Sequence, residues 1–217
     1  MQLYVVRHGI AVEGAGRMPD SSRPLTVKGR RRFQKTARAF GKLGGRIDLI
    51  LSSPLVRAVQ TAEILAGATD HREVGILEEL DPRVEIAELR SALASRAGKA
   101  KTIAIVGHEP QLSSLLAALF GVAQADIDLK KGAIVRLDLA TLTGGAPAEA
   151  RWWLKPKGAR AKGLPLQGKA KAGKELKAAK GQHGRKKERR AKRSSSAESA
   201  GAAVLETHHP VLGGAEA

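Results

Sequence analysis

Three apolar runs constrain the fold of this chain more than any other feature. They are Leu3–Val6, Ile47–Leu51 and Thr102–Val106, and nearly every residue in them is aliphatic. A strand that is apolar along its length is buried on both faces, which is typical of a parallel sheet covered by helices. Helical hydrophobic spacing follows each run. We therefore predict an α/β fold, a three-layer sandwich with a mostly parallel central sheet.

The remaining elements are predicted from periodicity and from helix-capping residues. Thr26 is expected to cap the first helix, with Leu43 on its buried side, and Ser52 or Ser53 to cap the second, with Pro54 in the first turn. The last two strands follow each other without a helix, so one of them is expected to run antiparallel at an edge. Helices are predicted at 27–43, from 54 onward, at 84–97 and at 111–120, and further strands at 74–77, 133–139 and 151–154.

Basic side chains follow each of the three apolar runs, at the point where the predicted strand ends. Arg7 and His8 follow the first run, Arg57 lies a few residues beyond the second, and His108 follows the third. Ligands in open α/β sheets bind beyond the carboxyl ends of the strands, so these side chains are expected to meet. Gly9 allows the backbone to turn sharply and to approach a ligand closely.

Two arginines and two histidines at one sheet edge suit a phosphoryl group. Arginine neutralises phosphoryl oxygens, and a histidine nitrogen can attack phosphorus in line. A metal held by the two histidines and Glu109 is the competing interpretation. The neighbouring arginines would repel a metal ion, so we predict a site without metal or other cofactor.

The motifs at the three strand ends resemble those of the histidine phosphatase (phosphoglycerate mutase-like) superfamily. The first two are Arg7-His8-Gly9 and Ser52-Ser53-Pro54, which precedes Arg57-Ala58 and Gln60-Thr61-Ala62. The third is Gly107-His108. The compact chain and the block Asp20…Arg23-Pro24-Leu25-Thr26 are similar to the SixA-type phosphohistidine phosphatases, over residues 1–155.

The resemblance implies a role for each of these residues. His8 would be the nucleophile that becomes transiently phosphorylated, before water hydrolyses the phosphoenzyme. Arg7, Arg57 and a protonated His108 would hold the phosphoryl oxygens and stabilise the transition state.

A second set of residues is expected to complete the pocket. Gly9, Arg23 and Ser52 are the predicted substrate-binding residues. The general acid would be Glu79 or Asp20, and the sequence leaves both open. The segment Leu77–Pro82 departs from the mutase motif. Because the nitrogen of a phosphoramidate leaves readily, a weak acid motif suits phosphohistidine better than a stable phosphomonoester.

The charge of the chain is concentrated toward its C-terminus. The net charge is +17; residues 1–154 carry 22 basic and 16 acidic residues, and residues 155–217 carry 16 and 5. From residue 155 to 193 the sequence lacks aromatic residues and hydrophobic periodicity. We therefore predict a histidine phosphatase domain at 1–155 and a disordered basic tail at 156–217. Residues 155–193 are expected to bind nucleic acid or another polyanion, or only to aid solubility.

The sequence as a whole predicts a cytoplasmic, metal-independent phosphohydrolase. It contains no cysteine and no apolar run long enough to span a membrane, so no membrane partner is expected. The substrate would be a phosphorylated protein, most simply one bearing phosphohistidine. The alternatives are a phosphatase of small phosphomonoesters, such as sugar phosphates or nucleotides, and a polyanion-binding protein that acts through the basic tail.

Overall fold

The structure is a computed structural model that describes residues 1–162. Within this range residues 15, 17, 44, 45, 72, 145, 146, 158 and 159 are excepted. The tail was predicted at 156–217, and its residues from 163 onward lie outside the described residues. Most of the expected polyanion-binding segment, 155–193, lies outside them as well. No helix of the described part is long and apolar enough to cross a membrane.

A seven-stranded sheet forms the centre of the described domain, in the order β3-β2-β4-β1-β5-β6-β7. The strands β1 to β4 pair in parallel, and β5, β6 and β7 are antiparallel to their neighbours. The antiparallel part is thus larger than the single edge strand predicted. The strands are β1 Gln2–Arg7, β2 Leu49–Ser52, β3 Gly75–Ile76, β4 Thr102–Gly107, β5 Ile134–Asp138, β6 Glu149–Leu154 and β7 Arg160–Lys162.

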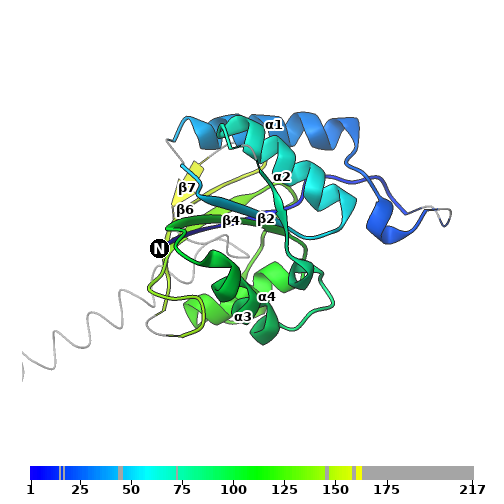
Figure 1. Cartoon of the computed structure of the whole chain (residues 1–217). Helices are drawn as coiled ribbons and strands as arrows, with labels where there is room; N and C mark the ends of the chain where they lie inside the picture. Colours follow the sequence, from blue (N-terminus) through cyan, green and yellow to red (C-terminus); the bar gives the residue numbers. More distant parts are fainter. Residues whose placement is uncertain are drawn as a thin grey trace, which may run out of the picture. The chain divides into compact units, whose positions relative to one another are not determined.

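Helices cover both faces of this sheet, as the apolar strands predicted. Figure 1 shows α1 and α2 on one face and α3 and α4 on the other. The helices are α1 Val27–Gly41, α2 Val56–Ala68, α3 Ile86–Ala97 and α4 Gln111–Phe120, with short 3-10 turns η1 Asp20–Ser22, η2 Glu78–Leu80 and η3 Gln124–Asp126. The three-layer α/β sandwich is confirmed.

The sheet separates two hydrophobic clusters of different composition. The cluster under α3 and α4 is built mainly from leucine, isoleucine and valine. The cluster under α1 and α2 contains Tyr4, Phe33, Phe40 and Trp152. The ring of Tyr4 meets that of Phe40 edge to face, with 4.7 Å between the centroids. The few aromatic residues of the chain therefore gather largely on one side.

Three local predictions need correction. Leu43 is 39% exposed, because α1 ends at Gly41, before the turn that would have buried it. The N-cap of α2 is Leu55, without a side-chain capping bond, so neither Ser52 nor Ser53 caps the helix and Pro54 precedes it. The sheet extends past residue 155, because β7 pairs with β6 and thus lies inside the segment predicted as tail.

Candidate active site

The carboxyl end of β1 carries the first two predicted residues, and its backbone is fixed on both sides. The amide of His8 donates to the Gly107 carbonyl at 3.1 Å, and the amide of Arg7 donates to the Ala133 carbonyl at 3.2 Å. The amide of Gly132 donates to the carbonyls of both Arg7 and His8 at 3.0 Å. The strand neighbours on either side therefore hold this turn.

His8 is oriented so that one ring nitrogen is available. Its Nδ1 lies 2.6 Å from the carbonyl oxygen of Gly9, which can only accept, so Nδ1 carries the proton and donates. The amide of Gly9 donates to Thr61 Oγ1 at 3.1 Å, which ties the Gly9 backbone to α2. Burial, then the neighbouring His108, lowers the pKa of His8 to about 3. At neutral pH the Nε2 atom is therefore unprotonated and nucleophilic.

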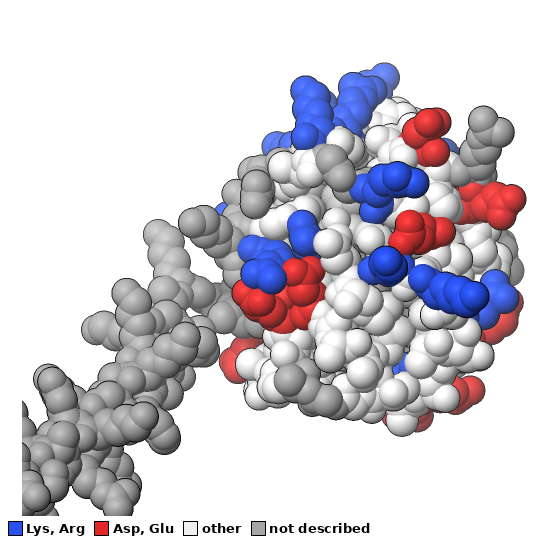
Figure 2. Space-filling view, turned by 60° about the vertical axis from the view of Figure 1, so that its left-hand side comes forward, with Lys and Arg blue, Asp and Glu red and all other residues white. Residues whose placement is uncertain are grey.

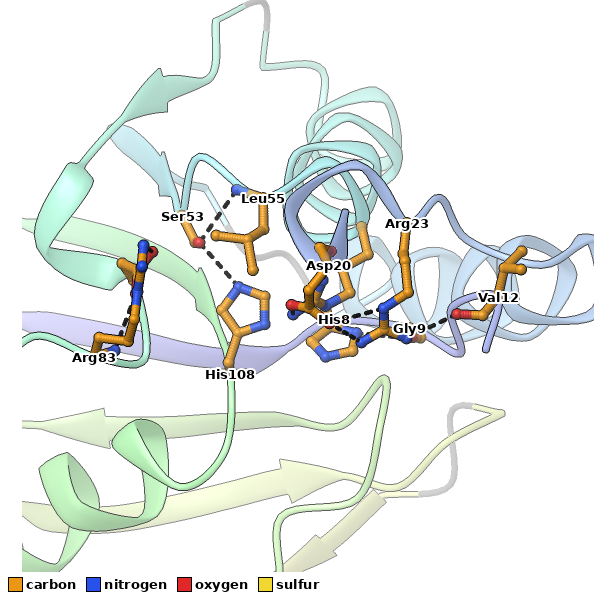
Figure 3. A network of polar contacts seen from close by, with 11 residues as sticks. His8, Gly9, Val12, Asp20, Arg23, Ser53, Leu55, Arg83 and His108 are labelled. Carbon is orange, nitrogen blue, oxygen red and sulfur yellow. Dashed lines mark hydrogen bonds and ion pairs between the residues drawn. The ribbon is translucent and has the colours of Figure 1, made fainter. Parts of the chain in front are cut away.

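His108 lies beside His8, as the strand-end argument predicted. The two ring centroids are 4.9 Å apart, and His108 Nε2 lies 2.9 Å from Ser53 Oγ (Figure 3). Its Nδ1 is buried and has no hydrogen-bond partner among the described residues. Burial, then the charge of Arg57, lowers the pKa of His108 to about 4. At neutral pH His108 is therefore neutral in this arrangement, whereas the family resemblance implied a protonated form.

Arg57 extends from the first turn of α2 into the same site, and a carboxylate already binds it. Its Nη1 donates to the Asp20 carbonyl at 2.6 Å and its Nη2 to Asp20 Oδ2 at 2.9 Å. Arg23 Nε donates to Asp20 Oδ1 at 2.8 Å (Figure 3). Two arginines thus share one anionic group, in the manner expected for the oxygens of a phosphoryl group.

Arg7 completes the set of cations. Its Nη1 donates to the Leu129 carbonyl at 2.7 Å, whereas its buried Nε has no hydrogen-bond partner in the described part of the chain. Burial lowers the pKa of Arg7, and the charges of Glu109 and Asp128 oppose that effect. An arginine stays charged under such a shift, so this guanidinium remains a cation with donor capacity to spare.

The three acidic residues around the site differ in their readiness to give a proton. Hydrogen bonds from Arg23, then from Arg57, lower the pKa of Asp20 despite some opposing desolvation, which makes it a poor general acid in this arrangement. Burial raises the pKa of Glu109, although Ser113 Oγ donates to its Oε2. Glu79 is only partly exposed, and its backbone carbonyl accepts from Gln111 Nε2 at 2.9 Å.

Sequence reasoning missed Ser53 and Gln111. Ser53, and not the predicted Ser52, contacts His108; the Ser52 hydroxyl is fully buried and donates to the Ser53 carbonyl at 2.9 Å. Gln111 Nε2 donates to the carbonyls of Glu79, Asp81 and Val84, which ties the acidic segment to the start of α4. Side-chain alternation predicts that Ser52 and Ser53 point to opposite faces, but does not indicate which of them meets His108.

Metal-binding side chains do not gather in this site. In the described residues no three His, Asp or Glu side chains lie close enough together to hold a metal ion. What converges is two neutral histidines and the guanidinium groups of Arg7 and Arg57. This arrangement binds an oxyanion and presents an imidazole nitrogen to it.

Comparison with known proteins agrees with this chemistry. The family model of the histidine phosphatase superfamily (branch 1) matches residues 3–83. The structure of the protein histidine phosphatase SixA complexed with tungstate superposes with a TM-score of 0.64 and 26% identity, over 72% of this chain and 97% of that one.

Two further relatives extend the comparison. An uncharacterised protein from Picosynechococcus is 38% identical over 139 residues, 63% of this chain and 84% of the relative. A mycobacterial glucosyl-3-phosphoglycerate phosphatase in complex with inorganic phosphate shares the fold, with a TM-score of 0.56 and 17% identity over 73% of this chain and 99% of that one.

Fold and site together define a phosphatase that works through histidine. The chain belongs to the histidine phosphatase superfamily, and its domain is of the SixA type.

Proposed function

We propose that this phosphatase removes phosphate from phosphohistidine on proteins, with His8 as the nucleophile. The observation that carries the proposal is the state of His8. Its Nδ1 is bound to the Gly9 carbonyl, and burial keeps its pKa near 3, so Nε2 holds a free electron pair at neutral pH.

In the first step, His8 Nε2 attacks phosphorus in line. A new phosphorus–nitrogen bond forms to His8, and the bond to the substrate nitrogen breaks. The leaving imidazole nitrogen takes up a proton from solvent water and departs neutral. Arg57 and Arg7 neutralise the phosphoryl oxygens, and Arg57 exchanges the Asp20 carboxylate for them.

In the second step, water attacks the phosphorus of the phosphorylated His8. The phosphorus–nitrogen bond breaks, inorganic phosphate leaves, and His8 returns to its neutral state with Nδ1 still bound to Gly9. The neutral His108 gains a strong electrostatic partner once a phosphoryl dianion is bound, which raises its pKa and favours the protonated form. His108 then adds a third charged donor to the oxygens.

The choice of phosphohistidine rests on the weak acid chemistry of the site and on the resemblance to SixA. Asp20 is held ionised by two arginines, and a phosphoramidate makes less demand on a general acid than a phosphomonoester does. The 26% identical SixA structure bears the name of a protein histidine phosphatase.

A second candidate, a phosphatase of small phosphomonoesters, is favoured by Glu109. This residue follows His108 directly, its Oε1 is buried without a hydrogen-bond partner among the described residues, and its pKa is raised by burial. A carboxyl group whose pKa is raised by burial holds its proton better than an exposed one, and can give it to an alkoxide leaving group.

The deciding experiment compares a phosphohistidine-bearing carrier protein with a panel of small phosphomonoesters, in EDTA. We expect fast, His8-dependent loss of phosphohistidine and slow ester hydrolysis. His8→Ala should abolish turnover, and His71→Ala, at the opposite end of α2 from Arg57, should not change it. Fast ester turnover that is lost in Glu109→Gln would instead establish the second candidate.

A further inference from the structure

Four cationic side chains lie along one face of α1. Lys28, Arg31, Arg32 and Lys35 are spaced by three and four residues, which places them one above the other on a helix. We call these four residues the α1 stripe. Figure 2 shows Lys and Arg side chains gathered at the upper edge of the molecule, where α1 lies. The stripe is about 10 Å long, from the rise of an α-helix.

Among the described residues, no carboxylate pairs with the α1 stripe. Helix α1 contains no acidic residue, and none of the ion pairs in the described part of the chain includes a member of the stripe. Like charges three and four residues apart on a helix repel each other and destabilise it. The four cations therefore do not stabilise α1, and another role is needed to explain them.

The α1 stripe borders a hollow in the surface. The hollow has a volume of about 430 Å³, and Val27 and Lys157 line it together with the stripe. The amide of Lys157 donates to Thr36 Oγ1 at 3.1 Å, which brings a fifth cation to this face. Val27 is 68% exposed, so an apolar side chain lies open beside the charges.

Helix α1, which carries the stripe, also packs against Gly9 and Ile10, the two residues that follow His8. The amide of Thr26, the N-cap of α1, donates to the Ile10 carbonyl at 2.9 Å, and a Cβ on Gly29 would overlap that same oxygen. Arg32 borders a second, smaller hollow together with Gly9 and Ile10. The helix that carries the stripe is thus packed against the two residues that follow His8.

We propose that the α1 stripe, with Lys157 and the hollow beside it, docks an acidic surface of the phosphorylated protein substrate. This inference rests on the proposed function. The stripe residues stand apart from the contacts that hold Arg7, His8, Arg57 and His108, so only a substrate larger than a phosphoryl group reaches both. The open Val27 and the aliphatic stems of lysine and arginine fit protein side chains. The stripe offers no aromatic ring on which a base could stack.

The test uses two synthetic phosphohistidine peptides that are identical except for four flanking residues, glutamate in one and glutamine in the other. For the full chain we expect kcat/KM to favour the glutamate peptide by about tenfold at low ionic strength, and less as salt is added. The variant Lys28→Gln/Arg31→Gln/Lys35→Gln should lose this preference and keep its activity on a small phosphoramidate.

The matched control removes three exposed cations from the other side of the sheet. Arg96→Gln/Lys99→Gln/Lys101→Gln changes the net charge equally, at the end of α3 and the start of β4, and should keep the preference. Equal kcat/KM for the two peptides, or an equal loss of preference in both triple variants, would overturn the proposal.

A binding measurement separates docking from catalysis. Fluorescence anisotropy of the unphosphorylated glutamate peptide should show weaker binding to the stripe variant than to the control variant, whether or not either peptide is hydrolysed. If the peptides bind in this way but are not hydrolysed, the proposed function fails and the docking surface stands. If a single-stranded oligonucleotide, and not the peptide, binds more weakly to the stripe variant, the surface binds nucleic acid and the proposal is overturned.

Discussion

The buried part of the site and the segment that covers Arg57 are built in opposite ways. His8, Ser53, Arg57 and His108 are each at most 7% exposed. The segment Asp20–Arg23 reaches Arg57 from the surface, and the Asp20 side chain is 63% exposed. Backbone hydrogen bonds to neighbouring segments fix His8, whereas ion pairs of the largely exposed Asp20 carboxylate hold the covering segment.

The buried part holds the histidines neutral and fixed, whereas the covering segment supplies a carboxylate that a ligand can replace. The Asp20 carboxylate is largely exposed, so in the proposed mechanism it returns to water when a phosphoryl group takes its place on the buried Arg57. The buried histidines are costly to charge, so they remain neutral and fixed until an anion arrives. In the proposed mechanism the reacting groups therefore lie in the buried part, and the ligand replaces a carboxylate of the covering segment.

The largest effect is expected in the buried part, from His8→Asn. Asparagine can still donate to the Gly9 carbonyl but has no nucleophilic nitrogen, so we expect kcat to fall by roughly 10⁴-fold with little change in Tm. Single-turnover quenching at alkaline pH and intact-mass analysis should show a phosphoenzyme in the parent protein and none in the variant. A phosphorylated His8→Asn protein would contradict the assignment of the nucleophile.

Arg57→Lys tests the link between the two regions. A lysine keeps the charge but cannot reproduce the two donors that meet the Asp20 carbonyl and Oδ2, so we expect kcat/KM to fall by about 10²-fold. The matched control is Arg83→Lys, whose guanidinium binds only Asp81 among the described residues and is largely exposed. An equal loss of kcat/KM in both variants would show that Arg57 has no special role.

The neutral histidines also make stability depend on pH. The pKa values of His8 and His108 are lowered to about 3 and about 4, so between pH 6.5 and pH 4 the unfolded chain binds more protons than the folded one. The free energy of unfolding should therefore fall with decreasing pH, by at most about 1.4 kcal/mol per pH unit for each histidine. Urea unfolding of His108→Gln should show a shallower fall, and an unchanged slope would contradict the burial argument.

The smallest effect is expected from Asp20→Asn in the covering segment. The variant removes the anion that competes for Arg57, so inorganic phosphate should inhibit about two- to fivefold more strongly, since an ion pair with a largely exposed carboxylate contributes only about 0–1 kcal/mol. Glu13→Gln, at an exposed position near the same segment, is the matched control. Weaker inhibition in Asp20→Asn would show that Asp20 positions the arginine and does not compete with the ligand.

Much of the fold and the identity of the four central residues could be predicted from the sequence. The apolar runs located β1, β2 and β4, and the leucine pattern located α4 at Gln111–Phe120. Thr26 is the N-cap of α1, as predicted, and its hydroxyl accepts from the Gly29 amide. These features are local, because hydrophobic period and capping depend on residues close together in the chain.

Other features depend on residues that are distant in sequence. Ser53 could not be assigned to His108 without knowing how β2 and β4 pair, and the carboxylate on Arg57 comes from a segment 37 residues away. The strand β7 is too short and too polar to be predicted from its own residues, and it exists because β6 offers an open edge.

The sequence by itself therefore determined the order of the elements, the strand ends that carry Arg7, His8, Arg57 and His108, and the class of chemistry they support. Only the tertiary structure decided the protonation states and the partners within the site. The pKa of a histidine depends on the burial and charges around it, and those are set by elements that meet only when the chain folds.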